Sequence, residues 1–269
     1  MPYQAIYETP ALRYQHMSEH SQKILESFYR QMLSGCQIHT IHDCSIGAGG
    51  TTLPLAGLGY LVSGSDLSSV MLEAARENFA LNGYTLELFV ADFREFGRYM
   101  AETVNCVIST GNSLPHVNLE GFHLFLDSAY SSLADEGYLF FDLRNWDALL
   151  AERPLIYIHN PIIMTAEEHR SFFQLFSWHD DNSVTFSFVT SLDREGQHVS
   201  EEILQAPRYY PLRLDDILSA LVQHGYRLLN LYDLDSIWTG LTEKPGKTGS
   251  FRSDFSLIQW YGVLAQKCR

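Results

Sequence analysis

Residues 41–66 read IHDCSIGAGGTTLPLAGLGYLVSGSD, and this stretch decides the fold. A β-prone segment ends at residues 43–45, a glycine-containing turn follows, and residues 52–58 form an apolar helical run. Gly59 closes that helix, residues 60–63 have the pattern of a second strand, and Asp66 stands just past its end. A strand, a glycine turn, a helix and a second strand with an acidic tip make half of a nucleotide-binding βαβ unit.

The residue types around the turn favour an adenosine-type ligand with a cationic end. Gly47 and Gly49 have no Cβ atom, so a ligand can approach the backbone closely there. Asp66 offers a carboxylate that accepts hydrogen bonds from both hydroxyls of a ribose. A dinucleotide-binding turn carries a third glycine where this chain has Thr52, and the carboxylate of Asp43 is unusual beside phosphates.

This run resembles motif I of the class I methyltransferases that use S-adenosylmethionine (SAM). Residues 65–72, SDLSSVML, resemble the next motif of that family, whereas Ser45 departs from it because many members have glycine there. The resemblance implies an α/β fold with a Rossmann-like seven-stranded sheet, SAM as cofactor and S-adenosylhomocysteine as product. The alternative is a flavodoxin-like or NAD-binding domain with a chance glycine turn.

The same resemblance implies a set of cofactor-binding residues. They are Asp43, Gly47, Ala48, Gly49, Asp66, Leu67, Met71, Asp92, Phe93 and Thr110. Asp43 would lie near the charged end of SAM, the glycine turn would admit its methionine part, and Asp66 would hold the ribose. Asp92 and Phe93, after a strand over residues 86–90, would hold the adenine. The alternative for Asp92 is the N-cap of a helix over residues 94–99.

Composition narrows the class of protein. The chain has 269 residues, 46% of them hydrophobic, and a net charge of −14, which fits one large soluble α/β domain or a core with an insertion. Because nucleic-acid affinity depends on clustered Lys and Arg, the acidic charge favours a small-molecule substrate over nucleic acid. No apolar run approaches about 18 residues, and residues 1–10 lack the features of a signal peptide, so we expect a cytoplasmic protein without a membrane segment.

Changes in pattern divide the chain into four parts. We expect an N-terminal helical or cap segment at residues 1–36, a SAM-binding Rossmann-like core at 37–150, and the final helix and core strands at 212–269. Between them, residues 151–211 are β-rich, and alternation in VTFSFV at 184–189 is typical of an antiparallel strand. We interpret this insertion, which follows the fifth strand, as a lid over the substrate. The fifth strand is expected at residues 138–143, after a turn at 135–137.

Three further stretches narrow the resemblance. They are GNSLPH at residues 111–116, DLRNWD at 142–147 and RYYPLRL at 208–214, and they are similar to segments of glycine N-methyltransferase and the glycine/sarcosine methyltransferases of betaine synthesis. The likeness implies that Asn112 and Arg144 hold a substrate carboxylate. It also makes Tyr7 and Tyr14 candidates for a segment that closes over the site.

Each of these residues has a structural alternative, which for Tyr7 and Tyr14 is ordinary packing. Arg144 could form an exposed salt bridge with Asp142 or Asp147, and Asn112 could be a turn former beside Gly111. His116 is expected to be an ordinary loop histidine rather than a general base.

The sequence therefore predicts methyl transfer from SAM to the amine of a small, carboxylated molecule of the glycine or sarcosine type. The sulfonium is already a strong electrophile, so no catalytic side chain and no metal are predicted, and orientation does most of the work. Two alternatives remain open: another small acceptor, through oxygen, sulfur or a larger amine, or a SAM-binding protein without catalysis. The oligomeric state is left open.

Overall fold

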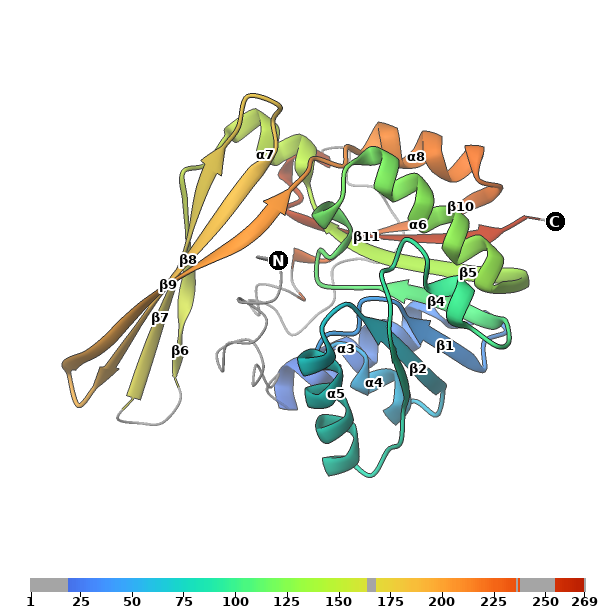
Figure 1. Ribbon diagram of the computed structural model, residues 1–269, viewed down its shortest axis with the longest axis horizontal. Helices are drawn as coiled ribbons and strands as arrows, with labels where there is room; N and C mark the ends of the chain where they lie inside the picture. Colours follow the sequence, from blue (N-terminus) through green and yellow to red (C-terminus); the bar gives the residue numbers. More distant parts are fainter. Residues whose placement is uncertain (1–18, 164–167, 236, 238–254, 269) are drawn as a thin grey trace.

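A seven-stranded sheet forms the core of the protein (Figure 1). The computed structural model describes residues 19–163, 168–235, 237 and 255–268. The strand order is β10-β11-β5-β4-β1-β2-β3; β1 to β5 are parallel, and β11 runs antiparallel to both of its neighbours. The strands are β1 (Thr40–Asp43), β2 (Leu61–Asp66), β3 (Glu87–Val90), β4 (Val104–Ser109), β5 (Leu133–Arg144), β10 (Tyr226–Asp233) and β11 (Trp260–Lys267). This confirms the predicted Rossmann-like α/β core.

Helices cover both faces of this sheet (Figure 1). On one side lie α3 (Glu19–Met32), α4 (Leu53–Gly57) and α5 (Ser69–Leu81); on the other lie the short helix η1 (Phe96–Tyr99), α6 (Leu119–Ser132) and α8 (Leu214–Gln223). Because side chains alternate along a strand, Leu139 and Phe141 of β5 pack on the α6 side and Phe140 packs on the α3 side. The apolar run at residues 139–141 is therefore buried on both faces of the sheet.

The carboxyl ends of the parallel strands bring four predicted segments to one edge of the sheet. β1 ends at Asp43, β2 at Asp66, β4 at Ser109 and β5 at Arg144. In open α/β sheets, ligands bind beyond this edge. The glycine turn, Asp66 and the segments at residues 111–116 and 142–147 thus meet there.

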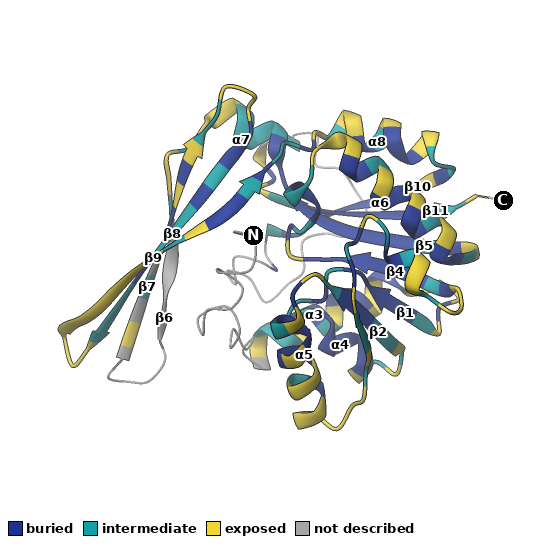
Figure 2. Cartoon of the chain, in the orientation of Figure 1, coloured by how far each residue is buried: buried dark blue, intermediate teal, exposed yellow. Residues whose placement is uncertain are grey.

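A second, four-stranded antiparallel sheet is inserted after β5 and α7 (Trp146–Glu152). Its strands are β6 (Ile156–Ile163), β7 (Glu168–Trp178), β8 (Val184–Arg194) and β9 (Gln197–Tyr209), in that order. Figure 2 shows that the buried residues of this sheet lie toward the end beside α7 and the core, whereas the first half of β9, at the opposite end, is exposed. The expected antiparallel insertion is confirmed; its role as a lid and the four segment boundaries stay predictions.

Two strand boundaries differ from those expected from sequence. β2 continues to Asp66, which pairs with Val90 of β3, so Asp66 is the last residue of the strand rather than a residue beyond it. β5 begins at Leu133, because the expected turn at residues 135–137 is a bulge within the strand: Val104 pairs with Leu133 and Cys106 with Tyr138. Local turn residues cannot reveal pairing that resumes on both sides of a bulge.

Candidate active site

Asp43, at the end of β1, hydrogen-bonds to residues on both sides of the glycine turn. This carboxylate is fully buried and accepts hydrogen bonds from the Ser45 backbone N–H at 3.0 Å and from the Thr52 hydroxyl. Burial raises the pKa of Asp43 to about 7. Gly49 adopts a left-handed φ of +76°, and a Cβ added there would lie 2.7 Å from the ring of Phe79. The hydrogen bonds of Asp43 and the missing side chain of Gly49 thus determine the conformation of the turn.

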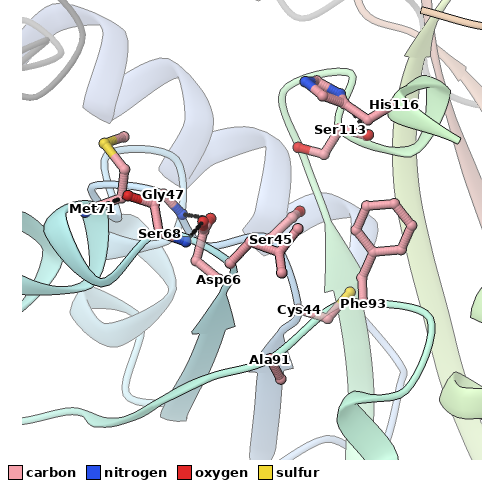
Figure 3. Close-up of a pocket in the computed structure, with 11 residues that line it drawn as sticks. Cys44, Ser45, Gly47, Asp66, Ser68, Met71, Ala91, Phe93, Ser113 and His116 are labelled. Carbon is pink, nitrogen blue, oxygen red and sulfur yellow. Dashed lines mark hydrogen bonds between the residues drawn. The ribbon is translucent and has the colours of Figure 1, made fainter. Parts of the chain in front are cut away.

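Beyond the turn lies a first cavity of about 150 Å³ (Figure 3). Gly47, Asp66, Leu67, Met71 and Phe93, all predicted to bind cofactor, line it. The other lining residues, which the sequence analysis did not select, are Cys44, Ser45, Ser68, Ala91, Ser113 and His116. Figure 3 shows Asp66 and Met71 on one side of this space and Phe93, Ser113 and His116 on the other. We call this space the cofactor cavity.

Asp66 is the acidic group of the cofactor cavity. One of its oxygens accepts from the Gly47 N–H and the other from the Ser68 N–H, each at 2.9 Å (Figure 3). Burial raises the pKa of Asp66 above its usual value. Each carboxylate oxygen can accept more than one hydrogen bond, so this orientation still leaves lone pairs for a ribose diol. The two backbone N–H groups fix the orientation of the carboxylate and leave each oxygen able to accept a further hydrogen bond.

Other predicted cofactor residues do not line this cavity. The carbonyl of Ala48 accepts from Asn78 Nδ2 at 3.2 Å, and the Thr110 hydroxyl lies 2.8 Å from the Thr51 hydroxyl. Asp92 accepts hydrogen bonds from the backbone N–H and the guanidinium of Arg94. The helix-cap alternative for Asp92 is wrong in detail, because η1 begins at Phe96. The assignments of Asp43, Ala48, Gly49, Asp92 and Thr110 to SAM remain predictions.

A second cavity, of about 220 Å³, lies between the core and the inserted sheet. We call it the acceptor cavity, and its lining residues are Gly111, Asn112, Arg144, Tyr157, Gln174, Phe186, Phe188, Tyr209, Asp235, Gln259 and Trp260. Both residues predicted to hold a carboxylate, Asn112 and Arg144, are in this set. Tyr7 and Tyr14 lie outside the described residues.

Arg144 is a buried cation without a carboxylate partner in the described part of the chain. Its Nη1 donates to Gln174 Oε1 at 3.1 Å, and its guanidinium carbon lies 5.1 Å from the Tyr157 ring centre and 5.8 Å from that of Trp260. Burial lowers the pKa of Arg144, although an arginine stays protonated in proteins. The exposed salt bridge considered as an alternative is wrong, because Arg144 is buried and forms no ion pair with Asp142 or Asp147 in the described structure; Asp147 pairs with Arg213 at 2.7 Å.

Asn112 combines both roles considered for it. Its φ of +59° after Gly111 is that of a turn former, yet its side chain is buried at the acceptor cavity. Its Oδ1 accepts from the Arg144 backbone N–H at 3.0 Å, and its own backbone N–H donates to Asp142 Oδ1 at 2.9 Å. Because the partner of Oδ1 is a donor, the amide orientation is determined and the NH₂ group is turned away from Arg144 N–H.

One loop separates the two cavities. Asn112 lines the acceptor cavity and the next residue, Ser113, lines the cofactor cavity. His116 lines the cofactor cavity, and its ring centre lies 4.3 Å from that of Tyr209, which lines the acceptor cavity. Burial lowers the pKa of His116 to about 4, so the ring is neutral near pH 7. A cofactor and an acceptor bound in the two cavities would therefore be neighbours across this loop.

The residues of the cofactor cavity fit SAM. Gly47, with a φ of +53° and no Cβ atom, lets a ligand approach the backbone closely. Asp66 offers a carboxylate for hydroxyl groups, and Phe93 and Met71 provide apolar walls for a flat ring. No group of three His, Cys, Asp or Glu side chains placed to hold a metal occurs among the described residues. None of the helices built from those residues has the length and hydropathy needed to cross a bilayer, and the cytoplasmic location stays a prediction.

Comparison with known proteins supports this assignment of the core. Residues 41–137 match the family described as methyltransferase domain. This match supports a SAM-dependent methyltransferase core. The matched segment begins in β1 and ends in the bulged part of β5, so it contains the glycine turn, Asp66, Asp92 and the Asn112 loop.

Relatives in sequence carry amino-acid N-methyltransferase names. The chain is 32% identical to the glycine/sarcosine N-methyltransferase of Halorhodospira halochloris over 124 residues, 46% of each protein. It is 33% identical to that of Aphanothece halophytica over 111 residues, 41% of this chain and 42% of that protein. The chain thus spans less than half the length of these relatives.

Solved structures confirm the fold over nearly the whole chain. A SAM-dependent methyltransferase from Clostridium acetobutylicum superposes with a TM-score of 0.70 at 15% identity, covering 92% of both chains. SAM-bound CalS10, an amino pentose methyltransferase from Micromonospora echinaspora, superposes with a TM-score of 0.69 at 12% identity, covering 98% of both. At this identity the likeness establishes the fold alone.

Proposed function

We propose that this protein transfers a methyl group from SAM to the amine of a small carboxylated molecule of the glycine or sarcosine type. The observation that carries the proposal is Arg144, a buried guanidinium that borders a cavity and has no carboxylate partner among the described residues. Burying a charge is costly unless it is paired, so such a site favours an anionic ligand. The names of the sequence relatives support an amino-acid amine as the acceptor.

The residues of the chain would act by positioning. When bound, SAM supplies a methyl carbon activated by a sulfonium. That methyl group would pass to the acceptor nitrogen, with S-adenosylhomocysteine leaving and the amine proton going to water. Arg144 and Asn112 would hold the acceptor carboxylate so that the nitrogen faces the loop shared with the cofactor cavity. Such orientation is worth on the order of 7–11 kcal/mol.

No side chain is required as a base in this scheme. The amine has only to be neutral when it attacks, and His116, with a pKa of about 4, is a weak proton acceptor. The inserted sheet borders the acceptor cavity through Tyr157, Gln174 and Phe188, which supports a role as a lid over the acceptor.

The test is release of S-adenosylhomocysteine, measured by mass spectrometry. Purified protein and SAM are combined with glycine, sarcosine and dimethylglycine, with their primary amides, and with simple phenols, thiols and larger amines. We expect turnover on a carboxylated amine, and we expect Arg144→Ala to lower kcat/KM by about 100-fold, because two charge-assisted hydrogen bonds are worth about 3 kcal/mol. Arg227→Ala is the matched control, since Arg227 also donates to a glutamine, Gln266, but is exposed.

The outcomes distinguish the proposed function from its two alternatives. Full activity of Arg144→Ala on a carboxylated amine would overturn the carboxylate role. Turnover confined to acceptors without a carboxylate would replace the substrate class and keep the methyltransferase. SAM binding without product on any acceptor would support a protein that binds SAM and does not catalyse transfer.

A further inference from the structure

Gln174, on the inner face of the inserted sheet, is the residue there whose side chain hydrogen-bonds to Arg144. Tyr157 of β6, Gln174 of β7 and Phe188 of β8 pair in register, so these three side chains form a row across the sheet, and all three line the acceptor cavity. Phe176 and Phe186, two residues further along β7 and β8, lie on the same face. Gln174 is 5% exposed, so its amide sits among aromatic rings, where a polar group needs partners.

The hydrogen bond to Arg144 determines how that amide is turned. Arg144 Nη1 is a donor, so the Gln174 atom that it meets at 3.1 Å is the oxygen. The Gln174 NH₂ group is then directed elsewhere, and it donates to no atom of the described residues. The same logic applies to the NH₂ group of Asn112, whose oxygen is held by the Arg144 backbone N–H.

Three groups of unused N–H donors therefore border one cavity from three elements. They belong to Asn112 in the loop after β4, Arg144 at the end of β5 and Gln174 in β7. Within the described part of the chain, Gln174 is the single hydrogen-bond partner of the Arg144 side chain. A site with donors on several sides and one buried positive charge suits a carboxylate, which only accepts.

We propose that Gln174 determines specificity for the acceptor's carboxylate: its oxygen positions the Arg144 guanidinium and its NH₂ donates to the bound carboxylate. The inference rests on the proposed function and extends the carboxylate site from the core into the inserted sheet. A glutamine suits this place because a glutamate there would pair with Arg144 internally and compete with the substrate. A neutral oxygen holds the guanidinium and leaves its charge for the ligand.

Two substitutions at Gln174 separate its roles. Gln174→Glu keeps the size and the acceptor oxygen but supplies an internal anion, and Gln174→Leu removes both hydrogen-bonding functions. The matched control is Gln266→Glu, which also places a carboxylate beside an arginine, Arg227; neither residue lines either cavity. Thermal unfolding and the Kd for SAM establish that each variant is folded.

The first readout is the ratio of kcat/KM for a carboxylated amine to that for its primary amide. Gln174→Glu is expected to lower this ratio by at least about 10-fold, mainly through KM of the carboxylated acceptor, while the Kd for SAM is unchanged. Gln174→Leu is expected to weaken the carboxylated acceptor about 5- to 10-fold. Gln266→Glu is expected to leave the ratio at its wild-type value.

The second readout needs no turnover. Acetate and acetamide are titrated calorimetrically into protein saturated with S-adenosylhomocysteine. If the wild type binds acetate selectively and Gln174→Glu abolishes this selectivity, the inference is supported even when no acceptor is methylated. Failure of the proposed activity is therefore recognised separately. A wild-type carboxylate-to-amide preference in both Gln174 variants overturns the inference, as does a wild type that does not distinguish acetate from acetamide. If Gln174→Glu does not fold, the Gln174→Leu result decides in the same way.

Discussion

Gly49 sets how closely the glycine turn approaches helix α5. A Cβ at this position would lie 2.7 Å from Phe79 Cε2, and its φ is +76°. We expect Gly49→Ala to destabilise the protein by roughly 2–4 kcal/mol, because about 1–2 kcal/mol of left-handed strain adds to about 1–3 kcal/mol of overpacking. The free energy of unfolding, measured with urea, checks this.

Gly83 is the matched control for that substitution. Its φ is +82°, but nothing lies within 4 Å of a Cβ added there. Gly83→Ala should therefore show the left-handed strain alone. Equal losses in the two variants would contradict the close approach of the turn to Phe79.

Asp142 links stability to pH. Burial raises its pKa from 3.8 to about 7, so the folded protein holds this proton more tightly than the unfolded chain does. Its contribution is therefore fully present below pH 3.8 and is lost as pH rises through about 7. Asp142→Asn keeps an acceptor for the Asn112 N–H and removes the titration, so its unfolding free energy should fall less between pH 6 and 8 than that of the wild type.

Urea unfolding at several pH values from 6 to 8 measures this difference. Asp43, whose pKa burial also raises to about 7, is present in both proteins and contributes a background slope to each. Identical slopes in wild type and Asp142→Asn would show that Asp142 does not titrate in this range.

At the scale of elements, Asn145 joins the end of β5 to the start of α7 and to the segment before β11. Its Oδ1 accepts from the backbone N–H groups of Asp147 and Ala148, as a helix N-cap, and its Nδ2 donates to the carbonyls of Phe255 and Ile258. The side chain is fully buried. All of its hydrogen-bonding capacity is thus used to hold three elements together.

Asn145→Ala should therefore cost about 3 kcal/mol or more, the sum of about 1 kcal/mol for the cap and about 1–3 kcal/mol for carbonyls left without donors. Asn145→Asp is the matched variant, because it keeps the cap and loses the donors. Thermal and urea unfolding of both variants compare the two functions. A loss no greater than that of an ordinary surface substitution would contradict this account.

At the scale of the whole molecule, we expect each cavity to bind its ligand independently of the charged residue in the other cavity. Asp66 belongs to the cofactor cavity and Arg144 to the acceptor cavity, and the loop at Asn112 and Ser113 lies between them. We expect Asp66→Asn to weaken SAM binding about 10-fold and to leave acetate binding unchanged. The asparagine amide has a single oxygen acceptor, whereas the carboxylate has two.

Arg144→Lys should do the reverse, and the double variant should show the sum of both losses. Calorimetric titration of SAM and of acetate into the three variants measures this. Strong non-additivity would show that the shared loop couples the cavities more tightly than their separate linings indicate.

Short-range patterns account for what sequence alone established. The glycine turn, the acidic strand tip and the mostly apolar strand at residues 138–143 are each defined within a few residues, so the Rossmann-like core and the place of Asp66 at the end of its second strand were predictable. The antiparallel insertion was predictable too, because alternation has a period of two wherever one face of a strand is buried.

Only the tertiary structure decided what surrounds Arg144. Residues 171–178 have the pattern of a short strand, but that pattern does not say which face turns inward or which core residue lies opposite it. Strand pairing places Gln174 beside Tyr157 and Phe188, and packing of that sheet against the core brings Gln174 within hydrogen-bonding distance of Arg144. The sequence determined the residue types and the strands that carry them. Contacts between distant elements decided that Arg144 is buried without a carboxylate partner in the described chain, because burial and pairing depend on the register and packing of whole sheets.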